Sequence, residues 1–140
     1  MPEKYRGIEL EIGGDLIGLK SALKDLDKDL GRTQNELKAV DRALKLDPTN
    51  TELAAQKQKL LAEQTERTKQ RVEALESAKA QADEAMAKGT EVNQEQYRAL
   101  VREIVKTKSN LRALETQTEQ LGNTVEEVGD SAKGAASDMS

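Results

Sequence analysis

Few side chains in this sequence could perform chemistry, because its 140 residues include neither histidine nor cysteine. Histidine is the commonest metal ligand and acid–base group, and the cysteine thiolate is a strong nucleophile. Carboxylate pairs such as Asp27 with Asp29 remain, but such a pair needs a pocket that separates the two pKa values. With 36% hydrophobic and 1% aromatic residues, the chain offers little material for a pocket. We therefore expect no enzyme activity, no catalytic residue and no cofactor.

One acidic cluster has the spacing of a calcium loop. Asp25, Asp27, Asp29 and Glu36 match positions 1, 3, 5 and 12 of an EF-hand. The sixth position, where the tight turn requires glycine, is Leu30. We therefore interpret these carboxylates as the solvated face of a helix and expect no metal site.

A leucine ladder predicts the first element that positions these side chains. Spacings of three and four alternate along the ladder, which is the a/d pattern of a coiled coil. Its apolar members are Leu16, Leu19, Leu23, Leu26, Leu30, Leu37, Val40 and Leu44. A stripe this narrow is typical of a helix–helix contact rather than of one wall of a globular core. We call it the seam and expect it to mediate self-association.

Two further helices continue the seam. The second has a weaker stripe, with Ala54, Leu61, Thr68, Leu75 and Ala82 at intervals of seven. The third carries the seam residues Tyr97, Leu100, Ile104, Leu111, Leu114 and Leu121. The expected helices span about 15–46, 51–88 and 93–121, and together they form a coiled-coil region over 15–121. Residues 122–140, which contain Gly, Ala and Ser, form a frayed tail or continue the third helix.

Local signals set these boundaries. Asp15 is a suitable N-cap for the first helix, and Asp47-Pro48 ends it, because proline lacks the amide that would continue a helix. For the second helix, Thr49 with Glu52 has capping-box spacing, and Asn50 or Thr51 could cap it instead. Gly89 is the expected C-terminal cap of that helix. Asn93 and Gln96 form a second capping box, where the third helix begins.

The N-terminal arm, residues 1–14, contains one short predicted strand. Ile8, Leu10 and Ile12 alternate with acidic residues, and Gly13-Gly14 ends the pattern. A lone strand cannot satisfy its backbone hydrogen bonds, so we expect it to pair with a strand of a second copy or of a partner protein. An extended arm without pairing is the alternative.

The predicted fold class is all-α, with long helices forming a helical hairpin or coiled coil after one short N-terminal β-strand. Charged residues make up 34% of the chain, and the net charge of -4 with a pI near 5.1 argues against nucleic acid as a ligand. No run of about 18 apolar residues is present, so we expect no membrane-spanning segment.

Three stretches, in this order, resemble the N-terminal region of tail tape measure proteins of long-tailed phages and prophages of Gram-positive bacteria. The first runs from Ile8 through Gly13-Gly14-Asp15 and is followed by Leu19 and Leu23. The second runs from Glu36-Leu37 through Leu44-Lys45-Leu46-Asp47-Pro48 to Leu60-Leu61. The third is Gln96-Tyr97-Arg98-Ala99-Leu100 with Arg102-Glu103-Ile104. They span most of residues 6–121.

The resemblance implies a structural virion protein that lies in the tail tube interior as a few parallel helical copies and sets tail length during assembly in the host cytoplasm. The tail tube protein, tail assembly chaperones and other copies of the chain would be its partners. Members of that family are several times longer than 140 residues, so we expect this chain to be an N-terminal piece. The resemblance carries over no catalytic or binding residue.

A second function class stays open on the residues alone. A cellular coiled-coil adaptor or chaperone would have the same composition and would use the seam to bind a helix of a partner. The neighbouring genes would separate the two hypotheses, since genes for tape measure proteins lie among those for other tail proteins.

Overall fold

The computed structural model describes residues 9–139, with the backbone alone described for Lys20 and for residues 122–139. Its elements in order are β1 (Glu11–Ile12), β2 (Asp15–Leu16), α1 (Leu19–Leu46), α2 (Thr51–Ala87) and α3 (Gln94–Met139). The predicted all-α class with a short N-terminal β element is confirmed. Four of the six predicted helix ends fall within one residue of the observed ones, and α3 continues beyond 121 to Met139.

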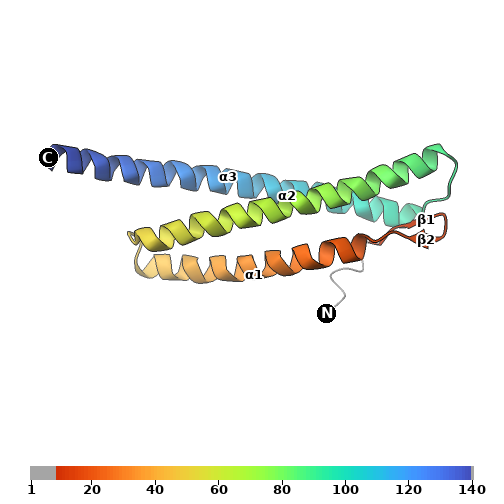
Figure 1. Cartoon of the computed structure of the whole chain (residues 1–140), viewed down its shortest axis with the longest axis horizontal. Coiled ribbons are helices and arrows are strands. Elements are labelled where there is room, and N and C mark those ends of the chain that lie inside the picture. Colours follow the sequence, from red (N-terminus) through yellow and green to blue (C-terminus); the bar gives the residue numbers. More distant parts are fainter. Residues whose placement is uncertain (1–8, 140) are drawn as a thin grey trace.

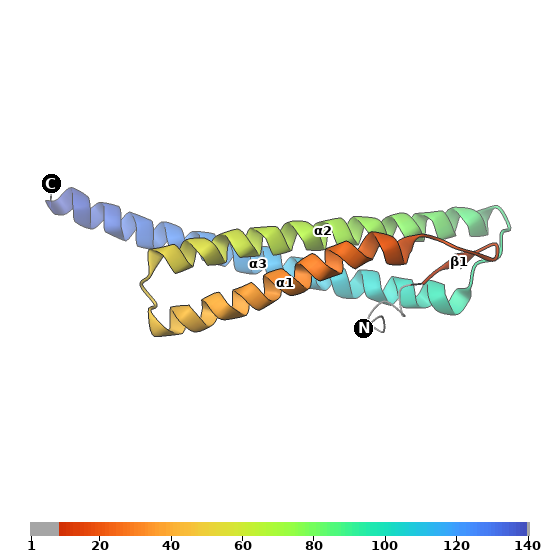
Figure 2. The same cartoon turned by 60° about the horizontal axis from the view of Figure 1, so that its bottom comes forward.

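The three helices form an elongated bundle in which α2 is the middle element (Figures 1 and 2). Both α1 and α3 pack along α2, whereas the backbones of α1 and α3 rarely approach each other. Each helix runs antiparallel to the one before it (Figure 1). With 37 residues, α2 spans roughly 55 Å at 1.5 Å per residue, so the molecule is a rod.

The reversal between α1 and α2 is built from four residues. The Asp47 backbone N–H donates to the Ala43 carbonyl and closes the last turn of α1. The Asn50 side-chain oxygen accepts the Leu53 N–H at 2.9 Å, and its amide donates to Asp47 at 3.0 Å. Asn50 is therefore the N-cap of α2, which settles the choice that the sequence left open.

A glycine ends α2 as predicted. Gly89 has φ +83°, a left-handed conformation that costs glycine little. The Gly89 N–H donates to the Met86 carbonyl and the Thr90 N–H donates to the Ala85 carbonyl. These two bonds form a Schellman motif and direct the chain into α3.

The start of α1 differs from the prediction. Gly13 and Gly14 have φ +61° and +87°, which suits the two-residue turn of a tight hairpin. In this turn Ile12 pairs with Asp15, and Glu11 with Leu16. Asp15 is therefore a strand residue rather than an N-cap. Helix α1 begins four residues later, at Leu19, and its N-cap Gly18 supplies no side-chain bond.

The other edge of β1 also pairs within the chain, so the expected pairing with a second copy or a partner is wrong for the described part of the strand. The Asn93 N–H donates to the Glu11 carbonyl at 3.1 Å, and Ile12 forms an isolated bridge with Val92. The Glu11 N–H donates to the Gln96 side chain at 2.7 Å. Only half of the predicted capping box forms: the Asn93 side chain accepts the Gln96 N–H, whereas the Gln96 side chain bonds the strand instead of the Asn93 N–H. Ile8 lies outside the described residues.

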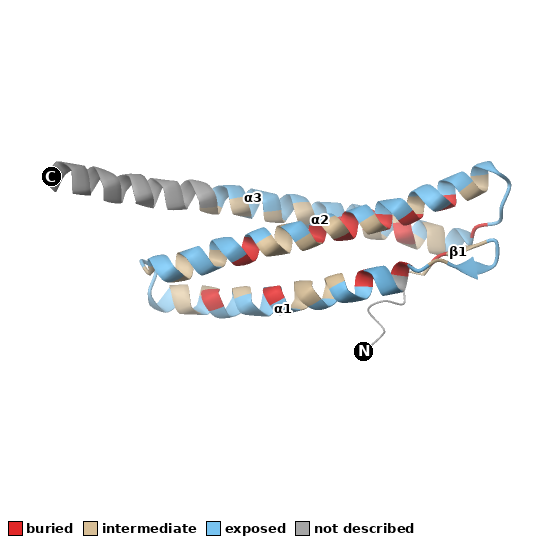
Figure 3. Ribbon diagram, viewed as in Figure 1, coloured by how far each residue is buried: buried red, intermediate tan, exposed pale blue. Residues whose placement is uncertain are grey.

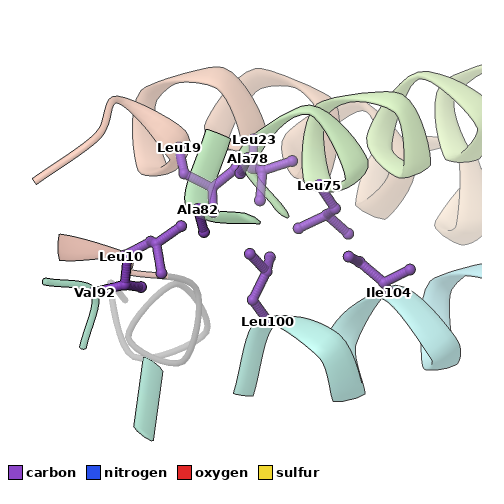
Figure 4. Close-up of a cluster of buried hydrophobic side chains, with 9 residues drawn as sticks. All are labelled: Leu10, Leu19, Leu23, Leu75, Ala78, Ala82, Val92, Leu100 and Ile104. Carbon is purple, nitrogen blue, oxygen red and sulfur yellow. The ribbon is translucent and has the colours of Figure 1, made fainter. Parts of the chain in front are cut away.

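The hydrophobic core lies where the hairpin meets the three helices (Figures 3 and 4). All three helices contribute to it, together with Leu10 just before β1 and Val92 just before α3, and Figure 4 shows the aliphatic side chains converging. Its buried members are Leu10, Leu19, Leu23, Leu75, Ala78, Ala82, Val92, Leu100 and Ile104. Toward the turn between α1 and α2, buried residues become sparse (Figure 3). The rod is therefore packed most tightly at the strand end.

Candidate functional site

The seam is the candidate site, and the structure buries part of it inside one chain. Leu19, Leu23, Val40, Leu100 and Ile104 are buried. Partly buried seam residues are Leu26, Leu30, Leu37, Leu44, Tyr97, Leu111, Leu114 and Leu121. The sequence assigned all of them to contacts between chains, but the antiparallel hairpin supplies α2 as a partner from the same chain.

Leu16 is a correction to the predicted seam. It lies in β2 and is 61% exposed. The ladder spacing extends one heptad too far toward the N-terminus, because the Gly13-Gly14 turn imposes extended backbone on the two residues that follow it.

A buried arginine links the three helices next to the core. The Arg71 Nε donates to Asp27 Oδ1 of α1 at 2.7 Å. Its Nη1 lies 3.0 Å from Glu103 Oε1 of α3 and donates to Thr107 Oγ1 at 2.6 Å. The Arg71 side chain is 11% exposed, and those of Asp27 and Glu103 are 13% and 25% exposed. One guanidinium thus fixes the position of α1 and of α3 on α2.

The sequence contained a signal for Arg71 that we did not use. Thr68, Arg71, Leu75, Ala78 and Ala82 follow spacings of three and four, so Arg71 occupies a seam position of α2. Asp27, which the sequence assigned to a solvated face, supplies its carboxylate partner. An arginine at such a position requires an acid on a facing helix, because a buried unpaired charge is costly.

Threonine hydroxyls occupy further positions of the seam. Thr33 and Thr107 are buried, and each donates to the carbonyl four residues earlier, at 2.8 and 2.7 Å. Thr65 and Thr118 bond their own helices in the same way, and their hydroxyls lie 3.4 Å apart between α2 and α3. These hydroxyls form hydrogen bonds within their own helices. Because threonine buries less apolar surface than leucine, the middle of the rod is stabilised less than it would be by leucines at these positions.

A groove of about 420 Å³ opens between α1 and α3 beside the buried arginine. Leu30 and Gln34 line it from α1, Gln64 and Thr68 from α2, and Leu114 from α3. Within the described part of the chain, Gln64 Oε1 is a buried polar atom without a hydrogen-bond partner. The groove combines apolar and amide side chains with hydroxyl and charged ones, among them Arg71, Glu103 and Lys106.

The acidic residues that matched a calcium loop lie on α1 without any interruption of the helix. Asp29 lies 3.6 Å from Arg67, and Glu36 lies 3.3 Å from Arg32. Among the described residues, no group of three His, Cys, Asp or Glu side chains is placed to hold a metal ion. The described part of the chain also contains no helix that is long and apolar enough to cross a bilayer.

Tyr97 is a seam residue with a polar role. Its hydroxyl donates to Asp83 Oδ1 at 2.6 Å, and Lys79 Nζ lies 2.9 Å from Asp83 Oδ2 and 5.7 Å from the centre of the Tyr97 ring. The hydrogen bonds from Tyr97 and Lys79 lower the pKa of Asp83 below its ordinary value. The hydrogen bond to Asp83 raises the pKa of Lys79. This cluster fastens the start of α3 to the end of α2.

Comparison with known proteins gives no match among protein-family models, curated proteins or solved structures.

Proposed function

We propose that this chain is a structural assembly module, the N-terminal segment of a tail tape measure protein. In this proposal it works as a folded helical rod during tail assembly. It would form in the host cytoplasm, meet tail assembly chaperones and the tail tube protein, and end inside the tail tube. Association with other copies of the chain belongs to the same proposal.

The observation that carries the proposal is where the three resembling stretches lie in the fold. The first stretch forms the hairpin and begins α1, and the third begins α3. Glu11 of the first bonds Gln96 of the third, and Leu23 and Leu100 share one core. The second stretch forms the turn with its Asn50 cap. The stretches that carry the resemblance therefore build both ends of the rod, which supports a shared fold rather than a shared composition.

Two simple observations test whether the protein belongs to a tail. We expect its gene to lie among tail genes, and we expect peptides from residues 51–121 in purified tails analysed by mass spectrometry. A gene outside any tail cluster, together with tails that lack these peptides, would favour the cellular adaptor or chaperone.

A matched deletion tests whether the folded hairpin persists in the tail. The ion pair between Asp41 and Lys57, at 2.8 Å, gives the register of α1 against α2. Residues 38–44 then face residues 54–60. Each range is one heptad long, lies outside the core and leaves the Asn50 cap in place. Deleting both ranges in a complete phage keeps the heptad phase of both helices.

We expect tail length to stay unchanged after this deletion, because a hairpin does not contribute its contour length to a ruler. If α1 and α2 were strung end to end, the loss of both heptads would shorten the tail by about 21 Å at 1.5 Å per residue. The control deletes one heptad from the helical region that follows this segment in the complete protein, which should shorten the tail by about 10 Å.

A further inference from the structure

Helix α3 has a second stripe, on the side opposite to its seam, that no other described part of the chain covers. Exposed residues follow spacings of four and three along this stripe, and they include Val105, which is 64% exposed. They are Arg98, Arg102, Val105, Ser109, Arg112, Thr116 and Glu119. We call this stripe the outer face of α3, and the exposed residues Lys106 and Glu115 flank it on opposite sides.

Charge is segregated along α3 in a way that the other helices do not share. From Arg98 to Arg112 the sequence has five Lys or Arg and one Glu. The next fifteen residues, 113–127, have four Glu and no Lys or Arg. In α1 and α2 both signs are interspersed from end to end. The basic half and the acidic half of α3 are therefore equal in length and opposite in charge.

The described charges of this face and its flanks find no partner among the described residues. Lys108, at the side of α3, bonds Glu76 of α2 at 2.6 Å. By contrast, Arg98, Arg102, Lys106, Arg112, Glu115 and Glu119 form no ion pair among the described residues. Arg98, Arg102 and Lys106 are also spaced at four, and like charges at that spacing destabilise a helix. This row of like charges lowers the stability of the isolated chain, and an acidic partner would offset that loss.

We propose that the outer face of α3 pairs antiparallel with the same face of a second copy of this chain. A two-fold axis near Leu111 places Arg102 of one copy near the partner's Glu119 and sets the basic half of each copy along the acidic half of the other, and the reciprocal contact follows by symmetry. In-register parallel pairing on this face would place like charges directly opposite each other. The pairing is independent of the proposed function, since it concerns the free protein before any parallel packing in a tail.

Charge complementarity identifies a second copy, rather than a nucleic acid, as the occupant. A polyanion would match the basic half and be repelled by the acidic half of the same stripe, and the whole chain has a net charge of -4. An antiparallel copy satisfies both halves at once. The contact is rich in charge and poor in apolar area, so it should depend strongly on salt.

Charge reversal in the 140-residue chain tests the pairing by sedimentation equilibrium. One variant combines Arg102→Glu with Lys106→Glu, and the other combines Glu115→Lys with Glu119→Lys. We expect the wild type to dimerise at low salt and each variant to be monomeric there. An equimolar mixture of the two variants should restore a dimer that contains one of each, because every reversed half then faces an opposite charge.

Salt dependence and a matched control complete the test. Raising salt from about 0.01 M to about 1 M shortens the screening length from roughly 30 Å to 3 Å, and we expect the dissociation constant to rise at least about tenfold. Lys38→Glu with Arg42→Glu makes the same change of net charge on α1 and should leave dimerisation unchanged. Circular dichroism verifies that each variant keeps its helices.

Several results would overturn the proposal. A wild-type protein that is monomeric at low salt would contradict the dimer. If that monomer were also retained on heparin, the basic half would be assigned to an anionic partner instead. Folded reversal variants that stay dimeric would place the contact on another face. Folded variants that are monomeric and fail to associate when mixed would also contradict it.

Discussion

Arg71 occupies a position of the α2 seam that an aliphatic residue would ordinarily fill. A buried ion pair is weak evidence for stability, because desolvation offsets much of the attraction between its charges. What it supplies here is geometry: the guanidinium has partners on α1 and α3 at once. A one-residue shift of either outer helix along α2 would leave a buried carboxylate unpaired. We therefore interpret Arg71 as the residue that fixes the register of the bundle.

Arg71→Met should destabilise the protein by about 3 kcal/mol, since it leaves Asp27 and Glu103 partly buried without a cation. Urea unfolding followed by circular dichroism measures this change. Adding Asp27→Leu and Glu103→Leu should recover most of the loss, because an apolar replacement of a whole buried ion cluster is often neutral or stabilising. Arg67→Met, which removes an exposed pair, should cost less than about 1 kcal/mol. Equal effects of the two arginine substitutions would contradict the interpretation.

The Tyr97–Asp83–Lys79 cluster predicts a pH dependence of stability. The folded pKa of Asp83 lies below its ordinary value of 3.8. Its contribution is therefore present above pH 3.8 and is lost as the pH falls through the lowered folded pKa. The folded pKa of Lys79 lies above 10.5, so its contribution is present below pH 10.5 and is lost as the pH rises through the raised value.

Tyr97→Phe removes the hydrogen bond that contributes most to the low pKa of Asp83. We expect the variant to be less stable than the wild type around neutral pH and the difference to disappear in acid. Thermal unfolding across a pH series measures it. The matched control compares Tyr97→Phe with the wild type in an Asp83→Asn background, where the difference should not vary through the acid range. A difference that persists in acid would mean that the hydroxyl acts without Asp83.

At the scale of the elements, local chemistry predicted the ends of the helices better than the strand. Proline at 48 and glycine at 89 act on their immediate neighbours, so short-range sequence signals sufficed for them. Besides β2, β1 has a second partner about 80 residues further along the chain, at Val92 and Asn93, and a short-range sequence pattern cannot reveal a contact over that distance. Leu16 was misassigned because two local signals conflicted. The regular leucine spacing favoured a helix at this residue, whereas the Gly13-Gly14 turn places it in a strand.

Two glycine substitutions should act in opposite directions. Gly14 has φ +87° with open space around its Cβ position, so Gly14→Ala should cost roughly 1–2 kcal/mol through backbone strain alone. Gly31 lies inside α1, also with open space, and Gly31→Ala should stabilise the protein by up to about 1 kcal/mol. Urea unfolding of both variants measures the two changes. A destabilised Gly31→Ala variant would show that α1 requires glycine for close packing at this point.

At the scale of the whole molecule, stability is distributed unevenly along the rod. The core gathers at the strand end, while the other half relies on threonines, amides and partly buried leucines. Heptad spacing predicted which residues face inward, but it cannot rank them, because Leu23 and Leu37 occupy equivalent positions in the sequence. Their burial differs because the hairpin closes the bundle at one end only. The same limit explains why the sequence could not say that α2 is the middle helix.

Leu23→Ala should therefore cost about 2–5 kcal/mol, as is usual for a fully buried leucine, and Leu37→Ala should cost clearly less. Urea unfolding compares the two variants. Native-state hydrogen exchange should show faster opening of amides near residues 40–60 than of those near residues 75–82. Equal losses together with uniform exchange would contradict a stability gradient along the rod.

The number of helices also has a mechanical consequence. Because the chain reverses twice, β1 and the end of α3 lie at opposite ends of the rod (Figure 1). Tension applied between these two points acts along the contacts that α2 makes with its neighbours, in shear. All the contacts of one interface then bear the load together, whereas tension across a two-helix hairpin would open it from its free end, one turn at a time. An odd number of helices thus allows this short segment to resist pulling along its axis without a disulfide or a large core.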